Sequence, residues 1–359
     1  MKVLVFSRSN LYDSKGGDTV QLLNTVSELK RLGVEIDIEL FGNNVDFNKY
    51  DLVHFFNIIT SEQILGLLKN LKVPFVVSTI FVDYGEYEQK ARKGIIGFVF
   101  KLLSPNFIHY LKTIVREILK NKRMPPLAYI LFGYKNSLKK IASTSAMLLP
   151  NSESEYQRLS TQLNSEFPYT VVPNGIDEKI FNLDVNPNNE FKDYILCVGR
   201  IEGRKNQLNL IKALKNTKYK LAIIGKPSPN HLKYYQSCKE EAGENVVFIN
   251  HIEQEKLVCI FKAARVHVLA SWFETTGLVS LEAAIMGCAI VITDKGDTRE
   301  YFKNNASYCE PDNISSIKTA VERAFDKGED KDLEKRIKSN YTWVKSAEMT
   351  KFAYEKVLR

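Results

Sequence analysis

Two glutamates eight residues apart, Glu274 and Glu282, are the side chains of this sequence best placed for chemistry. An apolar strand pattern at Val266–Ala270 leads to Glu274, and the next three residues, Thr-Thr-Gly, predict the start of a helix that carries Glu282. Eight residues make a little over two helical turns, so both carboxylates can project to one side. The apolar spacing places Glu282 near the edge of the buried stripe of this helix rather than on its solvent face.

The first turn of the same helix predicts an anion site. Backbone N–H groups near Thr276, Gly277 and Leu278 are expected to point outward without a partner inside the helix, the usual setting for a phosphate. A phosphate flanked by two carboxylates suits a sugar nucleotide, because carboxylates accept hydrogen bonds from sugar hydroxyl groups. The spacing alone also fits a glutamate that opens a helix and an unrelated second glutamate on its flank.

Two cations follow an earlier strand pattern. The predicted strand Tyr194–Val198 runs into GRIEGRKN, which places Arg200 and Lys205 at its carboxyl end. A bidentate guanidinium and a point-charge ammonium can together hold a diphosphate. Two cations in a loop are more often merely solvated, but here the two carboxylates follow two strand-helix units later.

A pair of glycines follows the first strand of the chain. Lys2–Phe6 is a buried-strand pattern, and SKGGDT lies between it and an amphipathic helix pattern. Gly16 and Gly17 tolerate backbone conformations that a side chain would forbid, so the chain can approach a ligand closely here. A plain glycine-rich turn explains the pattern as well, and the dinucleotide fingerprint GxGxxG is not met.

Further polar residues follow other strands of the first half. Asp83, Tyr84 and Glu86 lie just past a strand that ends near Thr79. That is the right end of a strand for a site, although an exposed loop has the same composition. His54, inside the strand pattern DLVHFF, is expected to be a hydrogen-bonded core histidine rather than a base.

The order of predicted elements indicates an α/β protein with two domains. Strands alternate with helices in both halves, as in doubly wound sheets, and 359 residues are comfortable for two cores. A strand is predicted at Tyr169–Val172, followed by a turn-rich hinge at 173–193. The final helix, Trp343–Val357, has a partial apolar face made of Trp343, Ala347, Phe352 and Val357.

Composition argues against several other classes. The N-terminal strand has too short an apolar run for a signal peptide, and no stretch offers the roughly 18 apolar residues of a membrane span. The five cysteines include no CxxC pair. We expect reduced thiols in a cytoplasmic protein, and no zinc site.

Most of the net charge of +8 comes from one segment. Between Lys90 and Lys140 there are twelve Lys or Arg residues and one acidic residue, Glu117, a net charge of +11 that leaves −3 for the rest of the chain. A helix is expected at Phe107–Lys122, and its apolar residues fall on one side: Ile108, Leu111, Ile114, Val115, Ile118 and Leu119. The basic residues fall largely elsewhere: Lys112, Arg116, Lys120 and Lys122.

This segment is typical of a helix that lies on an anionic membrane surface. The alternative is a pair of ordinary core-facing helices with solvated lysines. Nucleic acid is not expected as a partner, because neither a binding motif nor a base-stacking pattern accompanies the charge.

Taken in order, these motifs resemble the retaining glycosyltransferases of family 4. The resemblance covers most of the chain and rests on SKGGDTVQ, VPNGID, VGRIEGRKN, FETTGLVSLEA and GDTREYF. Of these, FETTGLVSLEA fits the E-x7-E motif of that family. It implies a GT-B fold, in which two Rossmann-like domains face each other across a cleft. Residues 1–172, with the crossover helix 343–359, would form the acceptor-side domain, and residues 173–342 would bind the nucleotide sugar.

The resemblance also implies transfer of a sugar from a nucleoside diphosphate sugar to an acceptor, with retained anomeric configuration and without a metal or other cofactor. Arg200 and Lys205 would bind the donor diphosphate and stabilise the charge on the leaving group. Glu274 would hold hydroxyl groups of the donor sugar, and Glu282 those of the ribose. Further donor contacts would come from Gly17, Gly199, Thr276, Gly277 and Leu278.

The acceptor side departs from the family pattern. Many members carry a histidine just after the strand that here ends at Thr79, whereas this chain has Ile80 and Phe81. Asp83 or Tyr84 would then make acceptor-side contacts. The basic segment of the first domain suits a lipid-linked saccharide, so we expect a peripheral enzyme of bacterial surface polysaccharide assembly, lipopolysaccharide or capsule, at the inner membrane face. A nucleotide-sugar epimerase and a non-catalytic membrane-surface binding protein are the alternatives.

Overall fold

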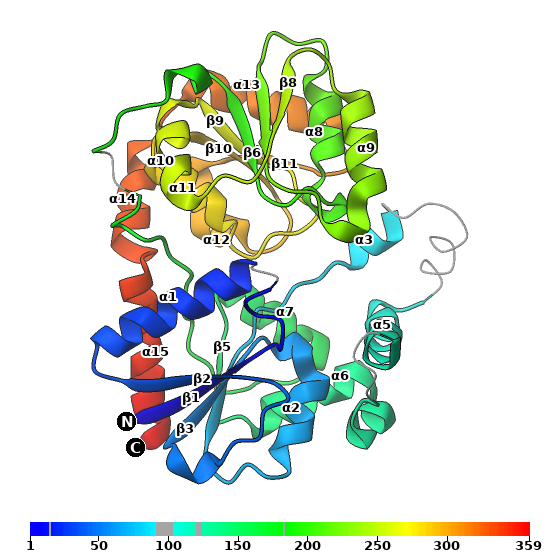
Figure 1. Ribbon diagram of the computed structural model, residues 1–359, viewed down its shortest axis with the longest axis vertical. Helices are drawn as coiled ribbons and strands as arrows, with labels where there is room; N and C mark the ends of the chain where they lie inside the picture. Colours follow the sequence, from blue (N-terminus) through cyan, green and yellow to red (C-terminus); the bar gives the residue numbers. More distant parts are fainter. Residues whose placement is uncertain (14–15, 91–102, 120–123, 182–183) are drawn as a thin grey trace. The chain divides into compact units, whose positions relative to one another are not determined.

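The computed structural model describes residues 1–13, 16–90, 103–119, 124–181 and 184–359. The chain divides into two compact units (Figure 1). Unit 1 is Met1–Asn174 together with Trp343–Arg359, and unit 2 is Gly175–Thr342. Each unit is a parallel sheet between two layers of helices, so the predicted α/β class is confirmed.

Unit 1 contains a parallel five-stranded sheet in the order β2-β1-β3-β4-β5. Its strands are β1 (Lys2–Ser7), β2 (Glu35–Leu40), β3 (Leu52–Phe56), β4 (Phe75–Ser78) and β5 (Met147–Leu149). The central strands β3 and β4 are buried along their whole length, because helices cover both faces of the sheet. The residues of such strands form nearly continuous apolar runs in the sequence, and for this reason the sequence predicts them well.

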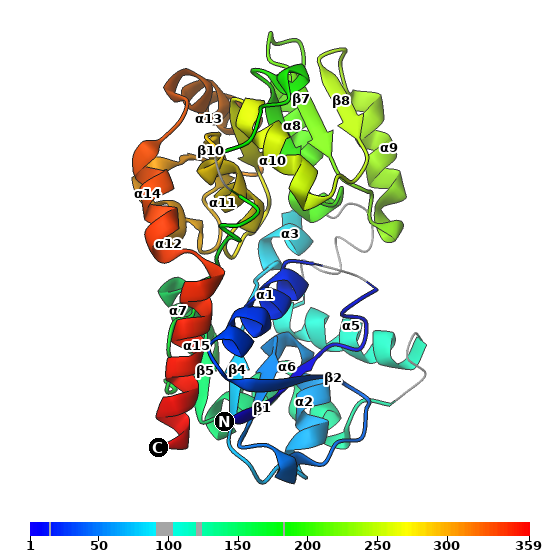
Figure 2. The same ribbon diagram turned by 60° about the vertical axis from the view of Figure 1, so that its left-hand side comes forward.

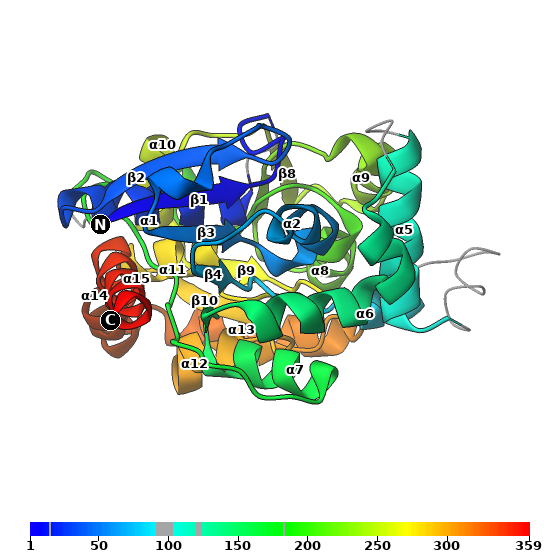
Figure 3. The ribbon, with the colours of Figure 1, turned by 90° about the horizontal axis from the view of Figure 1, so that it is seen from below.

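Two helical layers enclose this sheet (Figures 2 and 3). Among the described residues, the helices of unit 1 are α1 (Gly17–Arg31), α2 (Ser61–Leu68), α3 (Gly85–Lys90), α5 (Pro105–Leu119), α6 (Leu127–Thr144), α7 (Glu153–Leu163) and α15 (Trp343–Leu358). One apolar core lies between the sheet and α1 with α15. The other core lies between the sheet and α2, α6 and α7.

The last helix, α15, is fastened to unit 1 by a buried hydrogen bond. The Tyr354 hydroxyl lies 2.7 Å from Nδ1 of His54 on β3, and Nε2 of His54 lies 2.8 Å from the Ser78 hydroxyl. Burial lowers the pKa of His54 to about 3, so the ring is neutral, and the prediction of a core histidine is confirmed. The predicted apolar face of this helix is wrong at Phe352, which is exposed; Ala353 and Tyr354 are the buried residues at that level.

Tyr354→Phe should destabilise unit 1 by about 1–3 kcal/mol, because it leaves a buried ring nitrogen of His54 without its partner. The measurement is urea denaturation followed by circular dichroism. Tyr12→Phe is the control, since Tyr12 is more than half exposed. Equal unfolding midpoints for the two variants would contradict the assignment.

Unit 2 contains a parallel six-stranded sheet in the order β11-β10-β9-β6-β7-β8. Its strands are β6 (Ile195–Val198), β7 (Leu221–Ile224), β8 (Val246–Ile249), β9 (Val266–Leu269), β10 (Ala289–Thr293) and β11 (Ser307–Cys309). Its helices are α8 (Gln207–Leu214), α9 (Leu232–Glu241), α10 (Gln254–Ala263), α11 (Leu278–Ile285), α12 (Thr298–Phe302), α13 (Ile314–Lys327) and α14 (Lys331–Asn340). One core packs α10, α11 and α14 on the sheet, and the other packs α8, α9 and α13.

The strand predicted at Tyr169–Val172 is wrong. This segment donates backbone hydrogen bonds to Leu148 and Pro150 but forms only one bridge, between Leu148 and Tyr169. Prolines at 168 and 173 flank it and cannot donate a ladder bond, so the pairing does not extend into a strand.

In each sheet the strand order changes direction next to the first strand of the unit, which is β1 in unit 1 and β6 in unit 2. In unit 1 the reversal lies between β1 and β3, and in unit 2 it lies between β6 and β9. The loops that leave two such strands run to opposite sides of the sheet and open a crevice at its carboxyl edge, where ligands of α/β proteins bind. In unit 2 the loop after β6 carries Arg200 and Lys205, and the loop after β9 carries Glu274.

Candidate functional site

An ion pair joins the two loops at the strand reversal of unit 2. Lys205 Nζ donates to Glu274 Oε1 at 2.6 Å, and the Glu274 side chain is only 10% exposed. Lys205 ends the short 3₁₀ helix Gly203–Lys205 after β6, whereas Glu274 follows β9. The structure therefore brings together a cation and a carboxylate that the sequence placed 69 residues apart. A ligand that offers both a phosphate and hydroxyl groups could engage each partner of this pair.

Glu274 is held in place by the loop that follows β10. The Glu274 N–H donates to the Lys295 carbonyl at 3.2 Å, and the Asp297 N–H donates to the Glu274 carbonyl at 2.9 Å. A Cβ on Gly296 would lie 2.0 Å from the Glu274 carbonyl oxygen, and the φ of Gly296 is +98°. The two loops can approach so closely only because this residue is glycine. The motif GDTREYF thus supports the site through its backbone.

Gly296→Ala should displace the Glu274 loop and lower the thermal stability of unit 2, because the added methyl group meets backbone rather than a movable side chain. The expected cost is at least about 1 kcal/mol, the size of strain at one left-handed residue. Differential scanning calorimetry provides the measurement. Gly243→Ala is the matched control, since its added Cβ would meet only the end of the Asn245 side chain. If Gly296→Ala unfolds at the same temperature as wild type, the loops of Gly296 and Glu274 are not in tight contact.

The predicted anion site lies at the start of α11. Helix α11 begins at Leu278, with Gly277 as its N-cap residue in the left-handed conformation, so Thr276 and Gly277 precede the helix rather than form its first turn. The Gly277 carbonyl accepts hydrogen bonds from the Ser280 and Leu281 N–H groups. A Cβ at Gly277 would lie 2.7 Å from a methyl group of Ile292, which explains the glycine. That these residues bind phosphate or sugar stays a prediction.

Glu282 lies in the second turn of α11 and is 8% exposed. Its Oε1 accepts a hydrogen bond of 2.7 Å from Gln254 Nε2, at the start of α10. Burial raises the pKa of the carboxyl to about 8, and the hydrogen bond from Gln254 opposes this rise. Glu282 is therefore a buried acid with one defined side-chain donor, distinct from the ion-paired Glu274.

The pH dependence of the free energy of unfolding should reflect the raised pKa of Glu282. Between the ordinary value of 4.5 and about 8, Glu282 is ionised in the unfolded chain but protonated in the folded one. The folded state then binds more protons, so the contribution of Glu282 to the free energy of unfolding falls as the pH rises through this window. Glu282→Gln, which has no such proton, should gain stability relative to wild type from pH 5 to pH 8 in urea denaturation. Parallel pH profiles for the two proteins would contradict this assignment.

Arg200 and Gly199 directly follow β6. Arg200 is exposed and forms no ion pair among the residues that the structure describes. Its carbonyl accepts a hydrogen bond from the Gln207 side chain at 2.9 Å. A Cβ on Gly225, after β7, would lie 2.0 Å from the Gly199 carbonyl oxygen, so the two strand ends meet backbone to backbone.

Sequence reasoning missed the buried acid of this loop, Glu202. Arg204 Nη2 donates to its Oε1 at 2.9 Å, and the Ser228 hydroxyl donates to Oε2 at 3.1 Å. Burial opposes ionisation, but Arg204, Arg200 and Lys205 outweigh it and hold the pKa of Glu202 below its ordinary value. The available signal was a lone acid among the basic residues of GRIEGRK, since a buried carboxylate needs such neighbours.

Gly17 is the first residue of α1, and Gly16 is its N-cap residue. Arg8, which follows β1 and which sequence reasoning did not single out, binds the first turn of α1. Its guanidinium donates to Asp18 Oδ2 at 2.7 Å and to the Thr19 hydroxyl at 2.9 Å. Residues 14 and 15 of the motif SKGGDT lie outside the described residues.

Asp83 and Tyr84 follow β4, as predicted. Asp83 Oδ1 accepts the Gly85 N–H at 2.8 Å, which begins α3 and gives Asp83 a structural role. Before it, the Thr79 hydroxyl and the Phe81 N–H both donate to Oε1 of the buried Glu155. Between these two bonds Ile80 has a φ of +43°, a rare conformation for a β-branched residue. The acceptor-side role of Asp83 and Tyr84 stays a prediction.

The basic segment forms α5 and α6 in its described part. The predicted helix Phe107–Lys122 is observed as Pro105–Leu119, and residues 91–102 and 120–123, with Lys120 and Lys122, lie outside the described residues. Of the predicted apolar face only Ile108 is buried, whereas four of its members are exposed: Leu111, Val115, Ile118 and Leu119. Helix α5 therefore buries only part of its apolar face in unit 1, through Ile108 and Ile114.

Two basic residues of α5 are paired with acids of unit 1. Lys112 Nζ lies 2.7 Å from Glu88 Oε1, and Arg116 Nη2 lies 2.8 Å from Oε1 of the fully buried Glu62. Burial raises the pKa of Glu62 and Arg116 opposes that rise. Lys112 and Arg116 are thus ion-paired, while their side chains remain 42% and 44% exposed. Their role on the membrane side stays a prediction.

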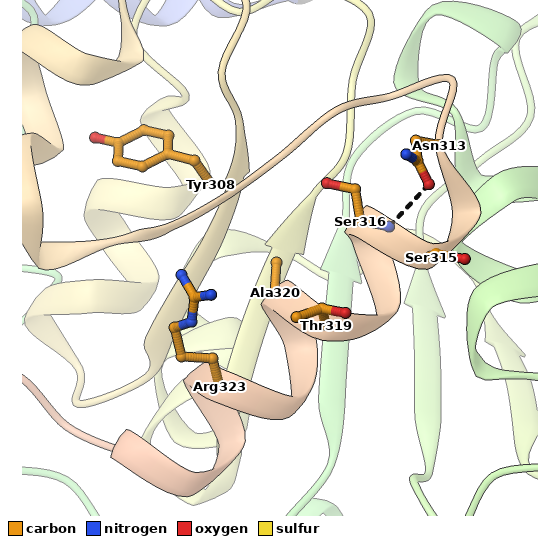
Figure 4. A pocket seen from close by; sticks show the side chains of 7 residues that line it. All are labelled: Tyr308, Asn313, Ser315, Ser316, Thr319, Ala320 and Arg323. Atoms are coloured by element: carbon orange, nitrogen blue, oxygen red, sulfur yellow. Dashed lines mark hydrogen bonds between the residues drawn. The ribbon is translucent and has the colours of Figure 1, made fainter.

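A hollow of about 270 Å³ lies elsewhere in unit 2 (Figure 4). It is lined by residues of β11 and α13 and of the turn between them: Tyr308, Asn313, Ser315, Ser316, Thr319, Ala320 and Arg323. The hydrogen bond drawn there runs from the Ser316 N–H to Asn313 Oδ1 and caps α13. None of the predicted site residues lines this hollow.

The described residues contain no group of three or more His, Cys, Asp or Glu side chains that could hold a metal ion. Across the same part of the chain, no helix is both long enough and apolar enough to span a membrane.

Comparison with known proteins identifies similar chains. Residues 178–343 match the family model of the glycosyl transferases group 1. A glycogen synthase of Mycobacterium tuberculosis is 26% identical over 197 residues, which are 52% of this chain and 48% of that protein. The N-acetylgalactosamine-N,N'-diacetylbacillosaminyl-diphospho-undecaprenol 4-alpha-N-acetylgalactosaminyltransferase of Campylobacter jejuni is 24% identical over 311 residues, 81% of this chain and 82% of that protein.

A solved structure extends the similarity to the whole fold. Anabaena HepE in complex with UDP-glucose superposes with a TM-score of 0.69 at 15% identity, covering 99% of this chain and 100% of that chain. At this identity the likeness shows the fold alone. The present chain spans about half the length of the first curated relatives that it matches.

Proposed function

We propose that this chain, whose residues 178–343 match the family model of the glycosyl transferases group 1, transfers a sugar from a nucleoside diphosphate sugar to a saccharide acceptor. The chain has the GT-B fold, with two doubly wound α/β units and a last helix that returns to unit 1. In finer detail, we propose a retaining, metal-independent enzyme of family 4.

The observation that carries the proposal is the Lys205–Glu274 ion pair at the strand reversal of unit 2. A donor sugar nucleotide has a diphosphate and vicinal hydroxyl groups, and these are the natural partners of an ammonium and a carboxylate. The complex of HepE with UDP-glucose supports this class of donor, because a similar fold holds one there.

In the proposed reaction the bond between the anomeric carbon and the donor phosphate breaks, and negative charge grows on the leaving diphosphate. Lys205 and Arg200 stabilise this charge, and such preorganised electrostatic stabilisation usually contributes more to the rate than any other single effect. Glu274 accepts hydrogen bonds from the sugar hydroxyl groups and Glu282 from those of the ribose. The acceptor oxygen forms the new bond to the anomeric carbon on the face that the phosphate leaves, and its proton passes to the leaving phosphate, so the configuration is retained without a protein nucleophile.

The proposed acceptor is a lipid-linked saccharide, and the proposed role is bacterial surface polysaccharide assembly. The name of the Campylobacter jejuni relative specifies a diphospho-undecaprenol acceptor, which supports this class. In unit 1 large apolar side chains are exposed on α5 and α6, with Leu119 at 72% and Leu131 at 73%. Exposed lysines accompany them on α6: Lys135, Lys139 and Lys140. An apolar surface bordered by cations suits an anionic membrane.

Sugar transfer should depend on one nucleotide class. UDP-, GDP- and ADP-sugars are incubated with an undecaprenyl diphosphate-linked saccharide, and the product is followed by mass spectrometry and proton NMR of the new anomeric centre. We expect transfer from one class, with the donor's anomeric configuration, in buffer with EDTA. Nucleotide release with an isomerised free sugar and no acceptor dependence would instead indicate an epimerase, and no turnover with any donor would contradict the proposal.

Membrane binding should depend on the exposed leucines of α6. Leu131→Asp should weaken binding to anionic vesicles by about tenfold or more, because burial of one leucine contributes roughly 1.5–3 kcal/mol. Vesicle co-sedimentation at low salt is the measurement. Leu232→Asp, a change of the same kind at a 60% exposed leucine of α9, is the control. Equal binding of both variants and wild type would remove the membrane from the proposal.

A further inference from the structure

We infer that Gln254 is a positioning residue for the donor nucleotide, because its side-chain amide fixes Glu282 as the acceptor of the ribose hydroxyl groups. This inference rests on the proposed function, which pairs Glu282 with the ribose. It adds Gln254 as the residue that orients the Glu282 carboxyl group toward the ribose hydroxyl groups.

The contact links two helices that are far apart in the sequence. Gln254 is the first residue of α10, directly after the loop that follows β8, and Glu282 lies 28 residues later on α11. The Gln254 Nε2 to Glu282 Oε1 distance is 2.7 Å, and Gln254 is itself half-buried. Both helices pack into the same apolar core, through Leu257 and Phe261 of α10 and Leu281 and Ile285 of α11. The hydrogen-bond donor Gln254 and the acceptor Glu282 therefore both lie on helices of the same packed layer.

The chemistry of the amide suits this task. Its NH2 group can only donate, so it occupies one carboxylate oxygen of Glu282 and sets the plane of the carboxyl group. The second oxygen stays available to the ribose: as the O–H of the protonated carboxyl group it donates to a ribose oxygen, and as a carboxylate oxygen it accepts from a ribose hydroxyl group. An ammonium or guanidinium in the same place would add a full charge and compete for the carboxylate, whereas a neutral amide leaves its accepting capacity intact.

A second glutamine provides a matched comparison within unit 2. Gln236 Nε2 donates to Glu240 Oε1 at 3.1 Å, but both residues belong to the same helix, α9, and lie on its exposed surface. Such a pair within one helix contributes little. Substitution of Gln236 therefore removes the same chemical group and the same type of bond without touching the predicted donor site.

The experiment uses Gln254→Met, which keeps the length of the side chain and removes its donor, with Gln236→Met as control. Dissociation constants of the nucleoside diphosphate and of its 2′,3′-dideoxy analogue are measured by calorimetry, and donor KM and kcat by transfer assay. We expect Gln254→Met to weaken the ribonucleotide by about fivefold, the size of one neutral hydrogen bond. The dideoxy analogue should bind Gln254→Met and wild type equally, and the donor KM should rise while kcat stays unchanged.

The inference is overturned if Gln254→Met weakens both nucleotides equally, if it weakens neither, or if it lowers kcat at unchanged KM. Should Gln254→Met not fold, Gln254→Asn serves instead, because its amide is one methylene too short to reach Glu282 and the same loss of ribose dependence is expected. A wild-type chain that binds no nucleoside diphosphate overturns the proposed function itself and this inference with it. Wild-type binding with an unaltered ribose dependence in both Gln254 variants overturns the inference alone.

Discussion

The ion pair between Lys205 and Glu274, at the carboxyl edge of β6 and β9, holds the candidate site together. The Glu274 side chain is nine-tenths buried, and Lys205, whose side chain is 28% exposed, supplies the close positive charge that offsets the cost of burying a negative one. The pair thus keeps two loops together before any ligand arrives. A donor that supplies phosphate to Lys205 and hydroxyl groups to Glu274 can compensate both charges, which makes the pair a template for the ligand.

The remaining structure of unit 2 serves to place this pair. The strand order reverses between β6 and β9, so the two loops begin on adjacent strands and diverge. Gly225 and Gly296 allow the neighbouring loops to approach within backbone contact on either side. Glu282 and Gln254 form a second polar contact on α11 and α10, in the same helical layer. The polar groups of the site are therefore fixed by sheet topology, by glycines and by one packed helical layer.

Much of this could be predicted from the sequence, for physical reasons. Strands buried on both faces are continuous apolar runs, so the pattern predicts β9 to within one residue of its observed end. The residues that support the site were harder to predict. Gln254 acts through a contact with a residue 28 positions away, which no local pattern encodes. Glu202 has basic neighbours in GRIEGRK, but its contact with Ser228, which joins two loops, cannot be read from that motif. The internal pairing of Arg116 with Glu62 was missed because helical periodicity shows which residues share a face but not what that face meets.

Calorimetric titration of a nucleoside diphosphate into wild type, Lys205→Met and Lys215→Met would show whether the diphosphate binds at this ion pair. Lys215 also pairs with a glutamate of unit 2, Glu241, at 2.9 Å, but on the exposed surface. We predict that Lys205→Met loses at least about tenfold in affinity, the value of one charge-assisted contact, while Lys215→Met binds as wild type does. Equal affinity of all three proteins, each with an intact folding transition, would show that the diphosphate does not bind at the Lys205–Glu274 pair.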